Sequence, residues 1–367
     1  MHILIWFLFL VGLFIYTASY FITLEIVDAS NNVLKQKQEQ ENSNQLQKAI
    51  QNARLRMGND DGKLQQWVEI AEKVPKDITK PKKPSITEAS MILDNTIYKQ
   101  DKAKKHILGI IAKHITNPGS LHGSVLGFKG NQGLGKTTLA KHGLSSAIGL
   151  PFSSIPLGGS SKQGDDLLKG HAYSYVGSHC GMVLNAIIES GSLNPIVFFD
   201  ELDKCDESAQ NALINITDPE HSHSFTDRYL GFPIDISKSV IIFAFNSKEN
   251  VNPILRDRMT EIHFDEYSEE DKKEITNRYT IDKMKKRYNL HLNVSSDAVN
   301  SIVKGLNPND SSIRRTEESL DKTVSMKLID ILKKKNDNDD SVSSLDITKN
   351  DVSFPEDTDT THLHMFS

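Results

Sequence analysis

The chain has 367 residues, of which 38% are hydrophobic and 25% are charged. This composition excludes fibrous, collagen-like and wholly disordered proteins and allows one or two globular domains. The formal net charge of -5 argues against a protein that binds nucleic acid through bulk positive charge. Two cysteines, Cys180 and Cys205, are too few for a disulfide framework and favour a reducing compartment.

The first feature along the chain is an apolar segment at residues 2–24, which contains no Asp, Glu, Lys or Arg. As a helix it would be about 35 Å long, enough for a bilayer core of about 30 Å. We predict a transmembrane anchor, with a cleaved signal peptide and a buried core helix as the alternatives. No Lys or Arg precedes the segment, which disfavours a signal peptide. The charges that follow it determine its orientation poorly.

Residues 28–85 are predicted to form a polar helical stalk that ends in a linker. Apolar residues spaced 4-3-4 from Leu46 to Met57 indicate one helix, and residues 63–74 indicate a second. Residues 75–85 contain three prolines and four lysines, which predicts a stiff, extended and solvated tether.

In residues 86–266 strands and helices alternate, which predicts an α/β domain: a parallel sheet with helices on both faces. The expected strands are 125–129, 152–156, 196–199 and 240–245, and the expected helices are 98–115, 136–148, 180–190 and 207–216.

After Phe264 no further strand is expected, and residues 267–335 are predicted to form a small helical lid domain. Its first helix begins at a capping box, Ser268-Glu-Glu-Asp271. Residues 336–367 are acidic and poor in apolar side chains, so we expect a disordered tail. The lid helices are expected at 269–289, 296–304 and 311–334.

The strongest motif follows the first expected strand and fits the pattern GxxxxGK[ST]. In such a loop the backbone N–H groups face phosphate oxygens, and the helix N-terminus adds a positive dipole end. The Lys136 ammonium can reach the β- and γ-phosphates, and the Thr137 hydroxyl can bind Mg²⁺. The predicted nucleotide-binding residues are Gly130, Asn131, Gln132, Gly133, Leu134, Gly135, Lys136, Thr137 and Thr138.

A second motif places two carboxylates, Asp200 and Glu201, directly after the apolar strand at 196–199. Ligands of parallel α/β sheets bind at this C-terminal end of the strands. We predict that Asp200 binds Mg²⁺, directly or through water, and that Glu201 polarises the attacking water.

Two further residues carry weaker signals. Asn246 ends another apolar strand, where an amide forms an Asx turn or orients water near a γ-phosphate. Arg258 follows a short helical segment, and an arginine can stabilise charge on a phosphoryl group of a neighbouring subunit. From the residue alone, a surface arginine is the favoured interpretation.

Together these motifs resemble the ATPase module of Lon proteases, a branch of the AAA+ superfamily of P-loop NTPases. The resemblance spans residues 93–334, about two-thirds of the chain. The combination of DPE with F-[ST]-D-x-Y-L is specific to Lon. The matching stretches are Leu157-Gly-Gly159, Gly170-His171, Tyr175-Val-Gly177, Asn194-Pro195, Asp200-Glu-Leu-Asp-Lys204, Asp218-Pro-Glu220, Phe225-Thr-Asp-Arg-Tyr-Leu230, Pro233-Ile-Asp235 and Arg256-Asp-Arg-Met259.

The resemblance implies ATP and Mg²⁺ as cofactors, protein substrates and a homo-oligomeric ring, in this family a hexamer. It also implies roles for single residues. Asn246 resembles sensor 1, Arg258 the arginine finger and Arg314 the sensor 2 arginine, with Arg315 as a neighbouring candidate.

The resemblance extends to two loops that contact substrate in this family. Tyr175 and Val176 resemble the first pore loop, whose aromatic side chain grips an unfolded chain, and residues 218–235 resemble the second. Ala172 and Tyr173 replace the basic residues usual before the pore tyrosine, so substrate grip is expected to differ.

Lon proteases continue past the lid into a Ser-Lys protease domain, whereas 32 residues, 336–367, follow it here. We therefore expect a membrane-anchored, single-pass ATPase that unfolds or remodels proteins without intrinsic protease activity, facing the cytosol or an equivalent reducing matrix. An AAA+ motor acting on nucleic acid is one alternative, which the net charge and the pore loops disfavour. An ATP-binding scaffold without turnover is the other, which the complete set of catalytic residues disfavours.

Overall fold

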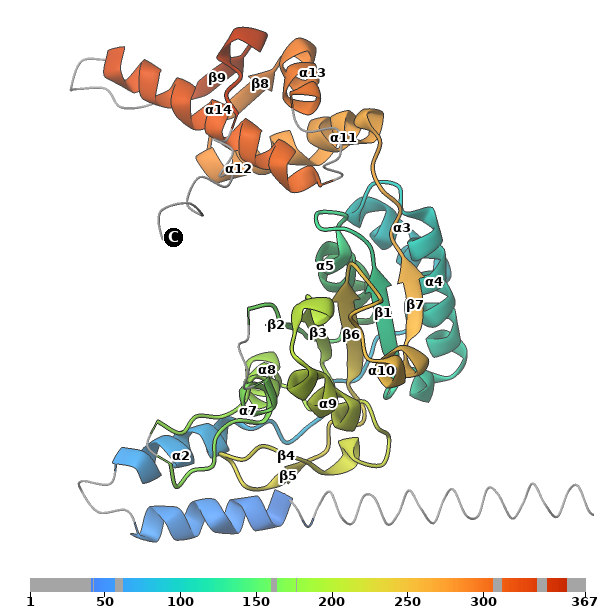
Figure 1. The fold of residues 1–367 in the computed structure, drawn as a ribbon, viewed down its shortest axis with the longest axis vertical. Coiled ribbons are helices and arrows are strands. Elements are labelled where there is room, and N and C mark those ends of the chain that lie inside the picture. The colour runs from blue at the N-terminus through green and yellow to red at the C-terminus, as the bar shows by residue number, and fades with distance from the viewer. Residues whose placement is uncertain are drawn as a thin grey trace, which may run out of the picture.

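The computed structural model describes residue 41 and residues 43–56, 62–159, 164–175, 177–305, 312–334 and 342–354 (Figure 1). The predicted anchor at 2–24 lies outside these residues. Among the helices that are described, none is both long enough and apolar enough to cross a bilayer.

A five-stranded parallel sheet in the order β2-β3-β6-β1-β7 forms the centre of the α/β domain. Four of its strands agree with the predicted ones. The edge strand β7 was not predicted, because its exposed side chains leave only Ile262 fully buried. The strands are β1 Val125–Lys129, β2 Phe152–Pro156, β3 Ile196–Asp200, β6 Val240–Phe245 and β7 Thr260–His263.

Helices cover both faces of the sheet, as the alternating pattern predicts. Alternate residues of β6 point to opposite faces: Ile242 packs in one apolar cluster, with α3, α4 and the helix after β1, and Phe243 in the other, with α8 and α9. Helix α3, Ile86–Thr96, was not predicted. The helix after β1 is continuous and consists of α5 Lys136–Thr138, a π-helical turn Leu139–Ser145 and α6 Ser146–Ile148. The other helices are α4 Asp101–Thr116, α7 Gly164–Lys169, α8 Met182–Ser190, α9 Glu207–Ile216 and α10 Pro253–Arg258.

The lid domain follows β7 and is helical, as predicted. The Ser268 hydroxyl accepts from the Asp271 N–H and the Asp271 carboxylate accepts from the Ser268 N–H, which confirms the capping box. The helices are α11 Glu269–Ile275, a π-helical segment Thr276–Thr280, α12 Ile281–Tyr288, α13 Ser296–Lys304 and α14 Ile313–Lys334.

The prediction of a disordered tail over 336–367 is wrong for part of that segment. Strand β9, Ser344–Ile347, pairs in parallel with β8, His291–Val294, in the lid. Leu345 and Ile347 are almost fully buried in the lid core, at 2% and 1% exposure. Averaging composition over the whole tail hid these two apolar residues, which the period of a strand brings to one face.

The N-terminal helices are present as predicted, but they do not form a solvated stalk. Residues 43–56 are helical, and α2 spans Gly62–Lys73. Ile50 and Trp67 are buried in the same apolar cluster as α8 and α9, so both helices pack on the α/β domain.

The prediction that residues 75–85 form a solvated tether is also wrong. The segment is extended, but it lies against the α/β domain. The Thr79 N–H donates to Asn194 Oδ1 at 2.7 Å, and Asn194 Nδ2 donates back to the Thr79 carbonyl at 2.9 Å. The Lys82 N–H donates to the Ile148 carbonyl at 2.6 Å. These partners are distant in sequence, so composition gives no sign of them.

The buried position of Leu345 predicts that β9 stabilises the lid. We expect Leu345→Ala to lower the free energy of unfolding of the lid by roughly 2–5 kcal/mol, because it removes buried apolar atoms and leaves a cavity. Chemical denaturation measures this loss. The control Ser344→Ala changes an exposed neighbour and should have an effect within about 0.5 kcal/mol. Equal losses in the two variants would contradict the role of β9.

Candidate functional site

The phosphate loop connects β1 to α5. Two of its glycines have a backbone conformation and close neighbours that both disfavour a larger residue. Gly133 and Gly135 have φ values of 77° and 86°, in the left-handed region that favours glycine. A Cβ on Gly133 would lie 2.2 Å from Ser312 Oγ, and one on Gly135 would lie 2.3 Å from a side-chain carbon of Ile97. A side chain at either position would strain the backbone and displace the neighbouring side chain.

Lys136, the first residue of α5, is buried and aims its ammonium back over this loop. It donates to the carbonyls of Gly130 and Asn131, the latter at 3.0 Å, and to Asn246 Oδ1 at 3.2 Å. Burial lowers the pKa of Lys136, and the nearby Asp200 carboxylate opposes that shift. The Lys136 ammonium therefore lies between the carbonyls of the phosphate loop and the side chain of Asn246, the residue that follows β6.

Asp200 is the last residue of β3 and Glu201 follows it, at the same C-terminal end of the strands. Burial raises the pKa of Asp200, which also accepts a hydrogen bond from the Glu201 N–H at 2.9 Å. Glu201 has a φ of 60°, an uncommon conformation for a residue other than glycine and one that clusters at active sites. Its Oε1 accepts from Gln132 Nε2 at 3.0 Å and from the Lys204 ammonium. The two motifs thus meet directly.

The sequence allows Asn246 either an Asx turn or a role near phosphate. In the structure its Oδ1 accepts a hydrogen bond from Lys136 of the phosphate loop at 3.2 Å. Its backbone is held by Asp203, whose Oδ2 accepts from the N–H groups of Asn246 and Ser247 at 3.1 and 3.0 Å. The sequence reasoning missed Asp203. Its position as a third acidic residue just after β3 was the available signal.

A cavity of about 540 Å³ lies between this edge of the sheet and the lid. Arg314 lines it, as predicted, from the first turn of α14. Two cations from α12 that were not predicted also line it: Lys283, 2.5 Å from Glu317, and Arg287, 2.8 Å from Asp321. The wall is formed by Gln132, Gly133, Leu134, Gly135, Lys136, Thr137, Thr138, Asp200, Glu201, Ala244, Phe245, Asn246, Lys283, Arg287, Ile313, Arg314, Glu317, Glu318 and Asp321.

A second cavity of about 370 Å³ adjoins the first and shares Gly133, Gly135 and Thr138 with it. Its character is more aromatic and apolar. Residues that the sequence reasoning did not select line it: Ile97, Tyr98, Tyr267, Ile275 and Tyr279.

Arg258, at the end of α10, does not line either cavity in its own chain. Its guanidinium donates to the Ile214 carbonyl at 2.5 Å and to Asp218 Oδ2 at 2.8 Å. Asp218 belongs to the DPE stretch that follows α9. The structure therefore separates Arg258 from the remaining site residues and ties it to the start of the loop 218–235.

The predicted pore loop residue Tyr175 lies in the segment between α7 and α8. The Tyr175 side chain is 67% exposed, at the tip of a turn closed by a hydrogen bond from the Tyr175 N–H to the Ala172 carbonyl at 3.0 Å. Val176 lies outside the described residues. Tyr173 packs its ring against Tyr229 of the loop 218–235, with centroids 6.0 Å apart.

Asp227 joins these two loops; it belongs to the stretch 225–230 that carries the family resemblance, but the sequence reasoning assigned no role to it. It is fully buried and accepts from the N–H groups of Gly181, Tyr229 and Leu230 at 2.7, 2.9 and 3.0 Å. Burial raises its pKa, whereas these three hydrogen bonds favour the carboxylate. One side chain therefore organises the turn of the second loop and the segment after the first.

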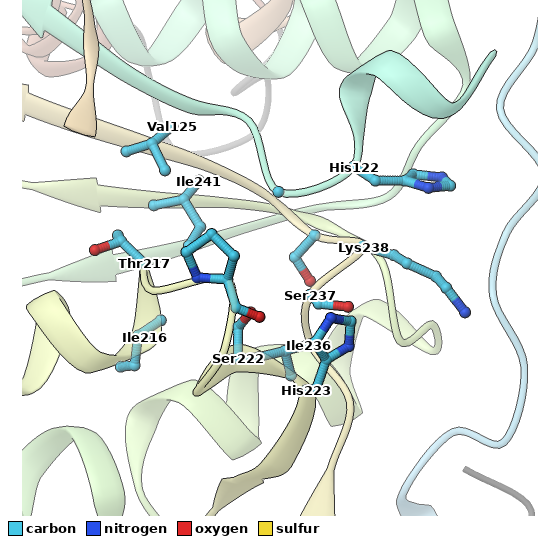
Figure 2. A pocket seen from close by; sticks show the side chains of 13 residues that line it. His122, Val125, Ile216, Thr217, Ser222, His223, Ile236, Ser237, Lys238 and Ile241 are labelled. Carbon is cyan, nitrogen blue, oxygen red and sulfur yellow. The ribbon is translucent and has the colours of Figure 1, made fainter. Parts of the chain in front are cut away.

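A further cavity of about 480 Å³ lies at the opposite, N-terminal end of the strands, beside the start of β1 (Figure 2). Val125 and Ile241 form part of its wall, and Ser222, His223 and Lys238 contribute polar groups. None of the predicted nucleotide-site residues lines it, whereas Pro219, Ser222 and His223 of the predicted second pore loop do. Because ligands of parallel sheets bind at the C-terminal ends of the strands, this cavity is not the place for nucleotide chemistry.

The comparisons with known proteins agree with this geometry. Residues 126–267 match the family described as ATPase family associated with various cellular activities (AAA). The chain is 36% identical over 221 residues to a Lon protease homolog of Acanthamoeba polyphaga mimivirus, which covers 58% of this chain and 21% of that protein. It is 34% identical over 229 residues to the peroxisomal Lon protease homolog 2 of Bos taurus, covering 61% of this chain and 26% of that protein.

The chain thus spans a fifth to a quarter of the length of the relatives it matches, and the similarity lies in the ATPase region. The phosphate loop, the carboxylates after β3 and the amide after β6 all fall within this region and meet at one cavity. The chain therefore carries an AAA+ ATPase module of the type found in Lon protease homologues.

Proposed function

We propose that the chain hydrolyses ATP with Mg²⁺ and uses the energy to unfold, translocate or remodel protein substrates. The observation that carries this proposal is the meeting of three motifs at one cavity. Gln132 of the phosphate loop bonds to Glu201 at 3.0 Å, and Lys136 bonds to Asn246 at 3.2 Å.

The residues present fit ATP and Mg²⁺. Gly133 and Gly135 adopt left-handed φ values that let successive N–H groups of the loop face phosphate oxygens, and the buried Lys136 supplies a cation beside them. The Thr137 hydroxyl and the Asp200 carboxylate supply the oxygen ligands that Mg²⁺ prefers. When bound, Mg²⁺ neutralises charge on the phosphates. The aromatic second cavity is of a kind that suits the base.

The proposed roles of the polar residues follow from their positions. Lys136 donates to phosphate oxygens in place of the loop carbonyls that it contacts now. Glu201 polarises the attacking water, and Asn246 orients that water. Arg314 contacts the phosphates from the lid and so couples nucleotide binding to lid position.

We further propose a homo-oligomeric ring, with six subunits by resemblance. Arg258 lies away from the cavities of its own chain, so it can act as an arginine finger only on the nucleotide of a neighbouring subunit. In the ring, the exposed Tyr175 is proposed to grip a protein chain.

We also propose that residues 2–24 anchor the chain in a membrane and that the ATPase module faces the cytosol or an equivalent reducing matrix. The apolar segment supports the anchor. Two free buried cysteines fit a reducing compartment. The proposed activity does not include cleavage of peptide bonds by the chain itself, since the similarity lies in the ATPase region of the relatives.

Variants of the nucleotide site separate binding from turnover. Lys136→Ala should weaken ATP binding by about 10- to 100-fold, because it removes a charged hydrogen-bond donor to phosphate. Glu201→Gln should leave ATP affinity near that of the unmodified chain and lower the hydrolysis rate by about 10²-fold or more. Fluorescent nucleotide titration and phosphate release measure the two quantities. Hydrolysis at an unchanged rate in both variants would refute the site.

A subunit-mixing experiment tests the arginine finger. Arg258→Ala should bind ATP normally and lose turnover by about 10³-fold or more. Mixing Arg258→Ala subunits with Lys136→Ala subunits should recover part of the activity, because one type of interface then contains both Lys136 and Arg258. Each variant alone is the control. Full turnover by a strict monomer would contradict the ring.

A peptidase assay tests whether the chain itself cleaves peptide bonds. The purified chain should release no peptides from casein in the presence of ATP and Mg²⁺. Lys136→Ala distinguishes a contaminant from the chain, because only cleavage by this ATPase would disappear with ATP binding. Casein cleavage that is lost in Lys136→Ala would overturn the proposal.

Membrane fractionation tests the anchor and its orientation. Protease added from the cytosolic side of intact membranes should digest residues 86–335, and a carbonate wash should leave the chain in the pellet. The control lacks residues 2–24 and should appear in the wash. Protection of the ATPase module, or release of the full chain by carbonate, would refute the arrangement.

A further inference from the structure

Helix α2 contacts the loop that carries Tyr175 through one lysine. Lys63 Nζ donates to the Tyr175 carbonyl at 2.8 Å and to the Tyr173 carbonyl at 3.4 Å. The same ammonium lies 5.8 Å from the centroid of the Tyr173 ring, within the range of a cation–π interaction. A single side chain from outside the loop therefore contacts it at three points.

The same face of α2 also contacts the second loop. Trp67, one helical turn after Lys63, donates its indole N–H to the Leu230 carbonyl at 3.3 Å. Its ring packs against Phe232, with centroids 6.3 Å apart. Each of the two loops thus gives a backbone carbonyl to a donor on α2.

Helix α2 is itself held firmly. Val68 and Ala71 are buried in the apolar cluster that also contains Ile50 of the helix 43–56. Between the two helices, Arg54 and Glu72 form an ion pair at 2.5 Å. Lys63 therefore extends from a packed helix to an exposed turn.

The other hydrogen bonds of Tyr175 lie within its own loop: its N–H donates to the Ala172 carbonyl at 3.0 Å, and its carbonyl accepts from the Ser178 N–H at 3.4 Å. The Tyr175 side chain is 67% exposed, so packing does not hold it. Gly177 follows this turn by two residues; its φ is 78°, and a Cβ there would meet no atom within 4 Å. Short-range hydrogen bonds leave such a loop more backbone freedom than packing would, so a donor from outside the loop adds order.

We propose that Lys63 is a positioning residue for Tyr175: its ammonium fixes the backbone of the turn 172–175 and leaves the tyrosine ring free to meet a protein chain. This proposal rests on the proposed function, in which Tyr175 grips substrate. It assigns to the N-terminal helical region a part in substrate engagement, beyond that of a spacer between the anchor and the ATPase module.

The test uses the full chain in detergent with four variants. Lys63→Met removes the donor and keeps the length of the side chain, whereas Lys63→Arg keeps a charged donor. Lys48→Met removes an equal charge from an exposed position on the neighbouring helix and is the matched control. Tyr175→Ala tests the proposed function itself. Two readouts are measured: ATP hydrolysis as a function of added unfolded casein, and the initial rate of chymotrypsin cleavage in residues 172–178.

In Lys63→Met we expect the casein concentration for half-maximal stimulation to rise about threefold to tenfold, since one charged hydrogen bond is lost at an exposed site. Basal hydrolysis should stay within about twofold of the unmodified chain, because Lys63 is distant from the nucleotide residues. Chymotrypsin cleavage in the turn should become faster. Lys63→Arg should restore both readouts, and Lys48→Met should change neither.

The outcomes separate the two proposals. If Tyr175→Ala abolishes stimulation and Lys63→Met behaves like Lys48→Met in both readouts, the positioning role is refuted and the proposed function stands. Faster cleavage without a change in stimulation also refutes the role, because the order of the turn then does not matter to substrate. If casein stimulates Tyr175→Ala as it does the unmodified chain, the proposed function fails, and the role of Lys63 fails with it.

Discussion

The position of β6 between β1 and β3 is the constraint on which the nucleotide site depends. Ile242 of β6 is paired with Leu126 of β1 on one side and with Phe198 of β3 on the other. Because all three strands are parallel and in this register, their C-terminal ends meet at one edge of the sheet. The phosphate loop, Asp200 and Asn246 are therefore neighbours although they are far apart in the chain.

The properties of that end of the sheet depend on two charged groups, Lys136 and Asp200, that are largely withdrawn from water. Burial lowers the pKa of Lys136 and raises that of Asp200, so it disfavours the charged form of each group. Each group also favours the charged form of the other through electrostatic attraction. Asp203 adds a structural link, since it binds the two N–H groups that follow β6. These contacts preorganise the edge before any phosphate arrives.

The loops 172–175 and 218–235 are organised in a different way. Their regular structure is limited to short pieces, such as the pair of two-residue strands β4 Phe225–Thr226 and β5 Pro233–Ile234, and distant side chains bind several of their remaining backbone groups. Asp227 accepts three N–H groups around the second loop, and Lys63 and Trp67 donate to carbonyls of both loops. The arrangement leaves Tyr175 exposed on a supported backbone. It also connects the loop 218–235 to Arg258 through Asp218.

The sequence by itself determined the α/β class, four of the five strands, the phosphate loop and the acidic end of β3. It did so because these features are local: apolar runs, glycines and a lysine at fixed spacing. The capping box at Ser268 was predictable for the same reason. Tertiary structure alone decided what depends on distant partners. The edge strand β7 gains its identity from pairing with β1, and residues 344–347 become a strand only beside β8. By composition the linker and the N-terminal helices look solvated. In the structure, Asn194 binds the linker and the apolar cluster around Trp67 binds the helices to the domain. Composition could not predict this, because partners more than a hundred residues away leave no mark on the local sequence.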